Sequence, residues 1–276
     1  SILRRAADLL ESNRTQLFSL CIREAGKTLG NALAEVREAV DFCRYYAQQL
    51  LDGKFKNGDK APGPVVCISP WNFPLAIFIG EVSAALAAGS PVLAKPAEQT
   101  PLIACLAVAL LHQAGVPRAV LQFLPGAGET VGAALTGDIR VRGVIFTGST
   151  EVAQLINQSI AKRDDVRLIA ETGGQNAMIV ESSALPEQVV EDVISSGFDS
   201  AGQRCSALRV LCLQNEISET VLSMLKAAMQ ELSIADPARL SSDIGPVIDL
   251  EARARLLAHI ESMRLRGRPI FQLPLP

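Results

Sequence analysis

The chain has 276 residues, and its 26 Lys plus Arg against 29 Asp plus Glu give a formal net charge of −3. This near-balance gives no support to nucleic acid or an anionic membrane as a partner. Hydrophobic residues make up 49% of the chain, so a disordered or collagen-like protein is excluded. The length suits one large domain or two of medium size.

The mean hydropathy of +0.25 is high, so a membrane span has to be considered. The best candidate, residues 73–93, carries Glu81 in its middle and contains two glycines and a proline. The next apolar run, residues 102–111, has about half of the roughly 20 residues that a span needs. We therefore expect a buried α/β core and no membrane span.

The six cysteines show no C-x-x-C pair and no regular spacing, and the first residues do not form a signal peptide. A chain with a large core needs no disulfides, so reduced thiols and a cytoplasmic location are expected. Only His112 and His259 are present, both in helical patterns. Two histidines are too few for a His-rich zinc site and give little support to a Ser-His-Asp triad. No metal is therefore expected.

Residues 1–51 have a helical pattern, with apolar residues recurring at steps of three and four. Gly26 and Gly53 are expected to end two helices there, and the polar, turn-rich residues 53–64 to form a connector. The chain starts without Met, and residues 267–276 resemble the beginning of a strand. A fragment of a longer polypeptide is therefore expected.

From residue 64 onward, short apolar runs alternate with helical patterns, and Thr100 with Pro101 marks one helix start. Strands that are apolar throughout and separated by helices indicate a parallel sheet covered on both faces. The fold class is therefore α/β, a doubly wound sheet of about five strands. The strands are expected at residues 65–69, 91–95, 120–124, 141–146 and 166–170, and the helices at about 75–88, 101–114, 127–136 and 149–162.

A second, incomplete α/β unit begins near residue 172, so the domains are expected at residues 1–171 and 172–276. Its strands are expected at residues 177–180 and 208–213, its helices at 186–199 and 216–232, and a polar loop at 202–206.

Residues 69–74, Ser-Pro-Trp-Asn-Phe-Pro, follow the first strand directly. Their two prolines predict a stiff turn at the carboxyl end of that strand, where open α/β sheets bind ligands. The Asn72 amide is a neutral donor suited to an oxyanion. The alternative is a turn whose Asn caps a helix.

Lys95 and Glu98 lie at the end of the next strand, where they can face the two hydroxyls of a ribose. A carboxylate there accepts from a 2′-hydroxyl and repels a 2′-phosphate, which favours NAD over NADP. A surface ion pair between the two residues is the alternative.

Thr147, Gly148 and Ser149 lie between a strand and a helix, where the glycine, the helix N-terminus and the hydroxyl suit a pyrophosphate. The glycine-rich residues 126–132 come nearest to a G-x-G-x-x-G fingerprint but have one residue too many. An ordinary glycine turn is the alternative for both segments.

Glu171 ends the last strand of the first unit and precedes Gly173 and Gly174. A carboxylate beside two glycines can move and hold a water, and partial burial would raise its pKa toward that of a general base. The alternative is a solvated residue at a strand end.

Cys205 alone among the cysteines lies in a polar loop, next to Arg204, which is the setting of a reactive thiolate. The others lie in apolar helix or strand patterns and are expected to be small buried hydrophobic residues. They are Cys21, Cys43, Cys67, Cys105 and Cys212.

In this order, these motifs resemble the aldehyde dehydrogenase superfamily. The chain is more closely similar to the L-glutamate semialdehyde (1-pyrroline-5-carboxylate) dehydrogenase module of the bifunctional proline utilization A flavoproteins, over nearly all of its length. That closer similarity rests on residues 23–28, 35–47, 171–190 and 198–209, including Thr172, where most of the superfamily has Leu.

The resemblance implies that Cys205 attacks the aldehyde and that Glu171 activates the hydrolytic water. The oxyanion would be held by Asn72 and the Cys205 backbone N–H. It implies NAD as cofactor, L-glutamate 5-semialdehyde as substrate and Ser206 as a candidate substrate contact. The residues expected to bind NAD are Ser69, Pro70, Trp71, Lys95, Glu98, Thr147, Gly148, Ser149 and Gly173.

Members of the family usually oligomerise, and the closer relatives carry a proline dehydrogenase module in the same chain. The second Glu-x-Phe-Gly-Pro motif of the family, its substrate-carboxylate loop and its oligomerisation hairpin are absent from these 276 residues. A non-catalytic remnant that at most binds NAD is therefore an alternative. A cysteine hydrolase or acyltransferase is another, but it needs a base near the thiol, and both histidines lie in helical patterns.

Overall fold

The computed structural model describes residues 1–53 and 61–274, so residues 54–60 of the expected connector lie outside the described residues. The chain divides into two compact units, each described here by itself. The first comprises Ser1–Ala25 and Gly30–Thr172, and the second comprises Gly26–Leu29 and Gly173–Pro276. The expected division after residue 171 lies one residue before the division between Thr172 and Gly173.

A five-stranded sheet forms the centre of the first unit, with all its pairs parallel and the strand order β3-β2-β1-β4-β5. This confirms the predicted α/β class. The strands are β1 (Val65–Ile68), β2 (Val92–Lys95), β3 (Leu121–Phe123), β4 (Gly143–Gly148) and β5 (Arg167–Thr172). The order reverses between β1 and β4, which is the place where open parallel sheets bind ligands.

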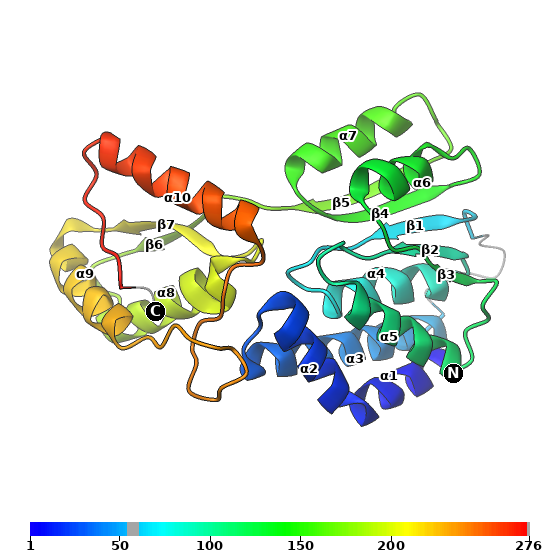
Figure 1. The fold of residues 1–276 in the computed structure, drawn as a ribbon, viewed down its shortest axis with the longest axis horizontal. Helices are drawn as coiled ribbons and strands as arrows, with labels where there is room; N and C mark the ends of the chain where they lie inside the picture. Colours follow the sequence, from blue (N-terminus) through cyan, green and yellow to red (C-terminus); the bar gives the residue numbers. More distant parts are fainter. Residues whose placement is uncertain (54–60, 275–276) are drawn as a thin grey trace. The chain divides into compact units, whose positions relative to one another are not determined.

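Helices cover both faces of this sheet (Figure 1). Alternate strand residues such as Cys67 and Ile145 belong to a large core with the first five helices, whereas Val66 and Phe146 face α6 and α7. The helices after β1 are α4 (Ala76–Ala87), α5 (Pro101–Gln113), the π-helical turn η1 (Gly128–Gly132), α6 (Ala133–Gly137) and α7 (Thr150–Ile160).

The N-terminal segment forms three helices where the periodicity predicted two: α1 (Ile2–Ser12), α2 (Arg14–Ala25) and α3 (Leu29–Leu51). The break falls at Asn13, whose side-chain amide donates to the Leu9 carbonyl at 2.8 Å and so competes with the helical hydrogen bonds. Gly26 and Gly53 adopt left-handed φ values of 64° and 66°, as expected of residues that end helices.

Two glutamates from distant helices cap α4 and α5. Glu35 on α3 is 1% exposed, and its Oε2 accepts from the backbone N–H groups of Leu75 (3.1 Å) and Ala76 (2.8 Å). Glu24 accepts at 2.8 Å from two N–H groups at the start of α5. The predicted N-cap Thr100 does precede α5, but its side chain makes no capping hydrogen bond. Each carboxylate thus satisfies donors at a helix N-terminus.

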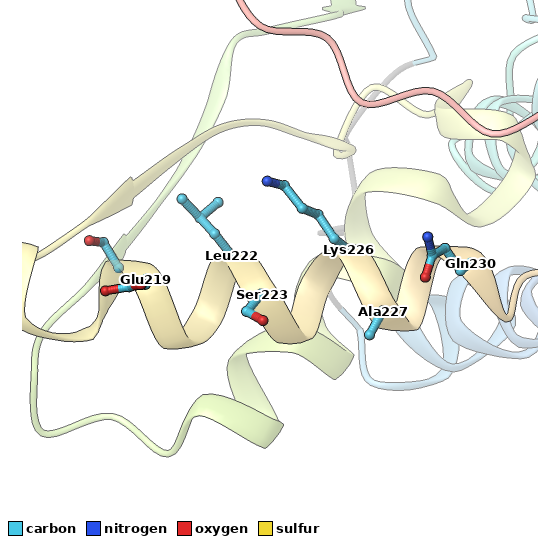
Figure 2. Close-up of a pocket in the computed structure, with 7 residues that line it drawn as sticks. Glu219, Leu222, Ser223, Lys226, Ala227 and Gln230 are labelled. Carbon is cyan, nitrogen blue, oxygen red and sulfur yellow. The ribbon is translucent and has the colours of Figure 1, made fainter.

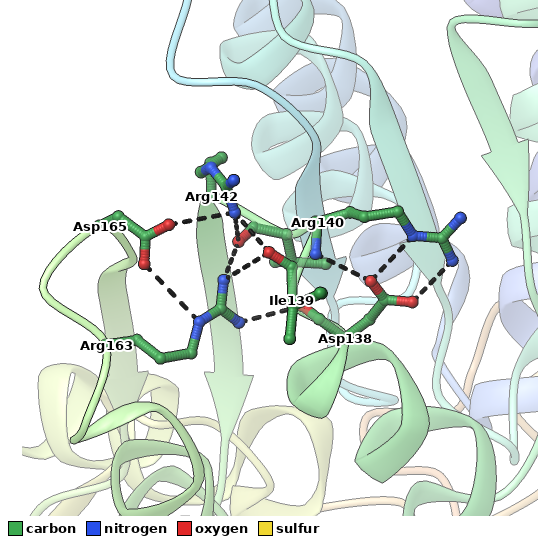
Figure 3. Close-up of polar contacts among 7 residues, drawn as sticks. Asp138, Ile139, Arg140, Arg142, Arg163 and Asp165 are labelled. Carbon is green, nitrogen blue, oxygen red and sulfur yellow. Dashed lines mark hydrogen bonds and ion pairs between the residues drawn. The ribbon is translucent and has the colours of Figure 1, made fainter.

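Arginines and aspartates join the loops at the amino end of the sheet, before β4 and β5 (Figure 3). Arg163 donates to the carbonyls of Asp138, Ile139 and Val141 at 3.0, 3.1 and 2.6 Å. Asp165 pairs with Arg163 and with Arg142, at 3.7 and 3.1 Å. We call Asp138, Arg140, Arg142, Arg163 and Asp165 the amino-edge cluster.

The second unit contains the parallel pair β6 (Asn176–Val180) and β7 (Leu208–Leu213). Helices α8 (Pro186–Phe198) and α9 (Asn215–Gln230) pack on one face of the pair around a core that includes Val180 and Val221. The other face is open, with Ile179 82% exposed. The short 3-10 helix η2 (Asp199–Gly202) follows α8.

A further helix, α10 (Leu250–Leu265), contains His259, which the sequence placed in a helical pattern, and none of its residues is buried. Asp249 caps it by accepting from the Ala252 N–H at 2.8 Å. The strand expected to begin in residues 267–276 is not formed in its described part, residues 267–274. Among the described helices, none combines the length and the apolar character needed to cross a membrane.

Candidate functional site

Most of the predicted site residues gather at the carboxyl edge of the first unit's sheet. All five strands are parallel, so they end at this edge. Register pairs Ile68 with both Lys95 and Phe146, and Thr147 with Glu171. The structure thus brings together the residues after β1, β2, β4 and β5, whereas Gly173, Cys205 and Ser206 belong to the second unit.

The turn after β1 leads through Pro70 and Trp71 to Asn72, and it is held at both of its ends. The backbone N–H of Ser69, which is 4% exposed, donates to the Lys95 carbonyl at 3.2 Å. After the turn, Glu35 fixes the first N–H groups of α4. Asn72 is half-buried between these two anchors, which suits a side chain that must present its amide in one direction.

Lys95 is 4% exposed, and its Nζ donates to the Pro96 carbonyl at 3.1 Å. Burial lowers the pKa of Lys95, while the nearby Glu98 and Glu129 oppose that shift. Glu98 itself is exposed at the end of β2. Its carboxylate can therefore accept hydrogen bonds from a ligand without first losing a buried partner.

The segment after β4 forms a tight entry into α7. A Cβ on Gly148 would lie 2.5 Å from the Phe146 ring, so a side chain here would clash with the core. Ser149 caps α7 by accepting from the Val152 N–H at 3.2 Å, which leaves its hydroxyl hydrogen free to donate. The glycine-rich residues 126–132 instead follow β3, away from the β1–β4 reversal.

Glu171 is exposed at the end of β5, and its register partner is Thr147. Gly173, two residues on, has no atoms within 4 Å of where a Cβ would lie. The segment directly after Glu171 is therefore not packed against other side chains at Gly173.

Glu81 on α4 is a residue of this edge that sequence reasoning missed. Its Oε1 accepts from the Thr147 hydroxyl at 2.8 Å, while its Oε2 is buried without a partner. Burial raises the pKa of Glu81 well above its ordinary value. In the sequence it was only a charge within an apolar stretch, because its partner lies 66 residues further along the chain.

The nucleophile candidate of the second unit follows a strained turn. Ser200 and Ala201 adopt left-handed φ values of 54° and 56°, which are unfavourable for residues with a side chain. Gly202 continues the turn at 67°. Cys205 and Ser206 follow it and are exposed, so the thiol is open to a reactant.

Arginine contacts fix this turn on both sides. The Arg204 guanidinium donates to the carbonyls of Ser195 and Ser196 at 2.6 and 3.1 Å and pairs with Asp199 at 3.3 Å. Arg209 donates to the Gly202 carbonyl at 2.8 Å. Arg204 was expected to activate the neighbouring thiol, but its Nη atoms bind the end of α8, so its contacts hold the turn.

Asn176, at the start of β6, completes the support of the Cys205 loop. Its side-chain amide donates to the carbonyls of Cys205 at 2.7 Å and Ala207 at 3.0 Å. The two carbonyls are thereby turned toward β6.

The other cysteines divide into two groups. Cys21, Cys43 and Cys67 are buried as predicted, and burial raises the pKa of Cys43 to about 12. Cys105 and Cys212 are exposed, so the prediction of burial is wrong for them. Cys105 lies in α5 and Cys212 in β7. Both elements have apolar residues on all sides, so the sequence does not indicate which side is buried.

An open pocket of about 560 Å³ within the described residues contains none of the predicted site residues. Figure 2 shows that its lining comes from one side of α9. The lining residues are Ser218, Glu219, Leu222, Ser223, Lys226, Ala227 and Gln230. In the described parts of the chain, no group of three His, Cys, Asp or Glu residues could hold a metal ion.

Comparison with known proteins completes this picture. Residues 1–271 match the aldehyde dehydrogenase family. The chain belongs to this family. It is 64% identical over 99% of its length to the "Bifunctional protein PutA" of Escherichia coli K12, of which it covers 21%. It is 36% identical over 97% of its length to a 1-pyrroline-5-carboxylate dehydrogenase of Geobacillus kaustophilus, of which it covers 55%.

Solved structures of the family agree with this fold. A crystal structure of bifunctional proline utilization A matches all of this chain with a TM-score of 0.95 and 51% identity, over 30% of its own length. A 1-pyrroline-5-carboxylate dehydrogenase from Thermus with bound NAD matches 94% of the chain with a TM-score of 0.89 and 34% identity, over 54% of its own. The chain thus spans a fifth to a half of these relatives.

Proposed function

We propose that this segment supplies the NAD-binding and nucleophile-bearing parts of a dehydrogenase that oxidises L-glutamate 5-semialdehyde to L-glutamate. The observation that carries the proposal is the 36% identity, over 97% of the chain, to a protein named 1-pyrroline-5-carboxylate dehydrogenase. Hydrolysis of 1-pyrroline-5-carboxylate yields this semialdehyde. The predicted residues and the scaffolds that hold them are consistent with such a reaction.

Cys205 is the proposed nucleophile, because its thiol is exposed on a loop fixed by Asn176 and Arg209. Its attack on the aldehyde carbon forms a thiohemiacetal oxyanion. The Asn72 amide and the Cys205 backbone N–H are the proposed donors to that oxygen. Ser206, also exposed, is the proposed contact with the substrate.

Glu171 is the proposed general base for hydrolysis of the thioester that remains after oxidation. It takes a proton from water, and the resulting hydroxide attacks the thioester carbon and releases the Cys205 thiolate. A mobile carboxylate suits this role, because it must leave room for the reduced cofactor to depart before water enters.

The carboxyl edge of the first unit fits NAD. Glu98 and Lys95 at the end of β2 suit the adenosine ribose, and Gly148 with the Ser149 cap of α7 suits the pyrophosphate. The main chain of Ser69, Pro70 and Trp71, with Thr147, is proposed to line the remainder, and Gly173 of the second unit is a further proposed contact with NAD. Bound there, NAD would supply the hydride acceptor for the oxidation.

The test is turnover of glutamate semialdehyde by the full-length protein that contains this segment, followed as NADH absorbance. Cys205→Ala should reduce turnover to background, because no thiohemiacetal can form. Cys212→Ser is the matched control, because Cys212 is another exposed thiol of the same unit, and it should keep full turnover. Full turnover by the Cys205→Ala protein would overturn the mechanism.

The second candidate is that this segment, which spans 55% of the dehydrogenase relative, binds NAD without catalysis. The 276-residue chain by itself distinguishes the two. If NAD raises its unfolding temperature while it gives no turnover, the segment alone is a binding module. Full-length turnover assigns catalysis to the longer chain, which by the bifunctional relatives would also carry a proline dehydrogenase module.

A further inference from the structure

Glu81 is a buried acid that the proposed mechanism does not use. Its side chain projects from α4 toward β4, where Oε1 accepts the Thr147 hydroxyl at 2.8 Å. Its Oε2 is buried and has no hydrogen-bond partner. An unsatisfied buried carboxyl oxygen is costly, so a native structure that keeps one calls for a reason.

The register of the sheet relates this acid to Glu171. Thr147 pairs with Glu171 on the neighbouring parallel strand, and residues in such a pair project to the same face about 5 Å apart. Ile145, two residues before Thr147, packs into the core of the first five helices. Thr147 and Glu171 therefore project to the face that α4 covers, where Glu81 lies.

Three further elements, β1, α3 and β2, neighbour α4. Cys67 on β1 is a buried thiol whose pKa rises further because of Glu81. The α3 helix contributes the Phe42 ring, which packs against Gly80. Lys95 on β2 follows Ala94 of this core and so projects to the opposite face. None of these three residues is a cation that faces Glu81, whereas Glu171 is the strand partner of Thr147, which contacts Glu81.

We propose that Glu81 is a positioning residue for Glu171: its protonated Oε2 donates a hydrogen bond to the Glu171 carboxylate when that side chain turns inward beside Thr147. The proposal rests on the role proposed above for Glu171. The bond satisfies the unpaired oxygen of Glu81 and gives the mobile base a defined inward position. Thr147 orients the pair by donating to Oε1.

The chemistry of the two acids supports opposite protonation states. Burial raises the pKa of Glu81 well above its ordinary value, which favours the protonated carboxyl that can donate. A donor to a carboxylate favours its ionised form and lowers its pKa. A hydrogen bond from Glu81 would thus stabilise the anionic form of Glu171, which is the form that accepts a proton from water.

The test compares the full-length protein with its Glu81→Leu and Glu81→Gln variants. In Glu81→Leu the donor is lost, so the acid limb of the turnover-against-pH curve should move up by about one pH unit. A larger burst of NADH before a slower steady rate should accompany this shift at pH 6, because thioester hydrolysis slows. Glu81→Gln keeps a donor N–H and should shift the limb less.

Ser83→Ala is the matched control, because Ser83 is a buried polar residue of the same helix, and it should leave the curve unchanged. If Glu81→Leu does not fold, Thr147→Val tests the same geometry and should move the limb in the same direction. An unmoved acid limb in the folded variant overturns the proposal. Failure of the proposed function would look different, because Glu171→Gln would then keep full turnover.

Discussion

The two edges of the five-stranded sheet use polar groups in opposite ways. At the amino edge, the Arg163 guanidinium donates to three carbonyls and pairs with Asp165. One side chain thus provides hydrogen bonds for the loop carbonyls and has its own charge neutralised. At the carboxyl edge, the buried Glu81 keeps an oxygen without a partner, and Glu171 is exposed. The contrast indicates that one edge serves stability and that the other keeps polar groups available for ligands.

The turn at the carboxyl edge leads into α4, whose first N–H groups are held by Glu35. Substitution of Glu35 tests how much this cap contributes to stability. Glu35→Ala leaves the buried N–H groups of Leu75 and Ala76 without an acceptor and opens a cavity. We expect a loss of about 3 kcal/mol in the free energy of unfolding. Urea denaturation measures it, and Glu35→Gln, which keeps an acceptor oxygen, should lose about 1 kcal/mol. Equal losses in the two variants would contradict a capping role.

The amino edge predicts a smaller loss of stability without a loss of function. Arg163, whose side chain is 18% exposed, secures the loops before β4 and β5. We expect Arg163→Ala to cost about 2 kcal/mol, because partly exposed carbonyls regain water. Turnover at low temperature should not change. Arg140→Ala is the control: that exposed side chain pairs only with Asp138 among its described partners, and thermal unfolding should not move. A fall in turnover in Arg163→Ala would contradict the view that the amino edge serves stability alone.

The smallest expected effect concerns the pH dependence of stability. The folded-state pKa of Glu81 is raised, so the unfolded chain releases this proton at a lower pH than the folded one. Stability is therefore lost as the pH rises from the unfolded pKa toward the folded one. Glu81→Gln should unfold at a more constant temperature between pH 5 and pH 8. A steeper fall in the variant than in the parent would contradict the buried, neutral carboxyl.

Much of the first unit could be predicted because its strands are short, apolar and evenly spaced. Each of the five strands lies within two residues of its expected bounds, and Gly26 and Gly53 marked true helix ends. The break at Asn13 was missed because Asn interrupts a helix through a side-chain bond that leaves the apolar periodicity intact. For α10 only the helical pattern around His259 was recognised and no bounds were predicted, because none of its residues is buried.

Site residues could be predicted where a short local motif contains them. They could not be predicted where the site depends on a contact between segments that are distant in the sequence. The residues at the strand ends came from local motifs such as Gly148-Ser149. The contacts of Glu24, Glu35 and Glu81 each join residues at least 40 positions apart, which a local pattern cannot reveal. Whether Cys105 and Cys212 are covered likewise depends on how the elements pack.

The exposure of three thiols has a practical consequence for chemical labelling. Cys105, Cys205 and Cys212 are all open to solvent among the described residues. An alkylating reagent such as iodoacetamide would therefore modify more than one position, and loss of activity after treatment would not identify the nucleophile. In a variant in which Cys105 and Cys212 are replaced by serine, the amount of label bound per chain would measure the modification of Cys205.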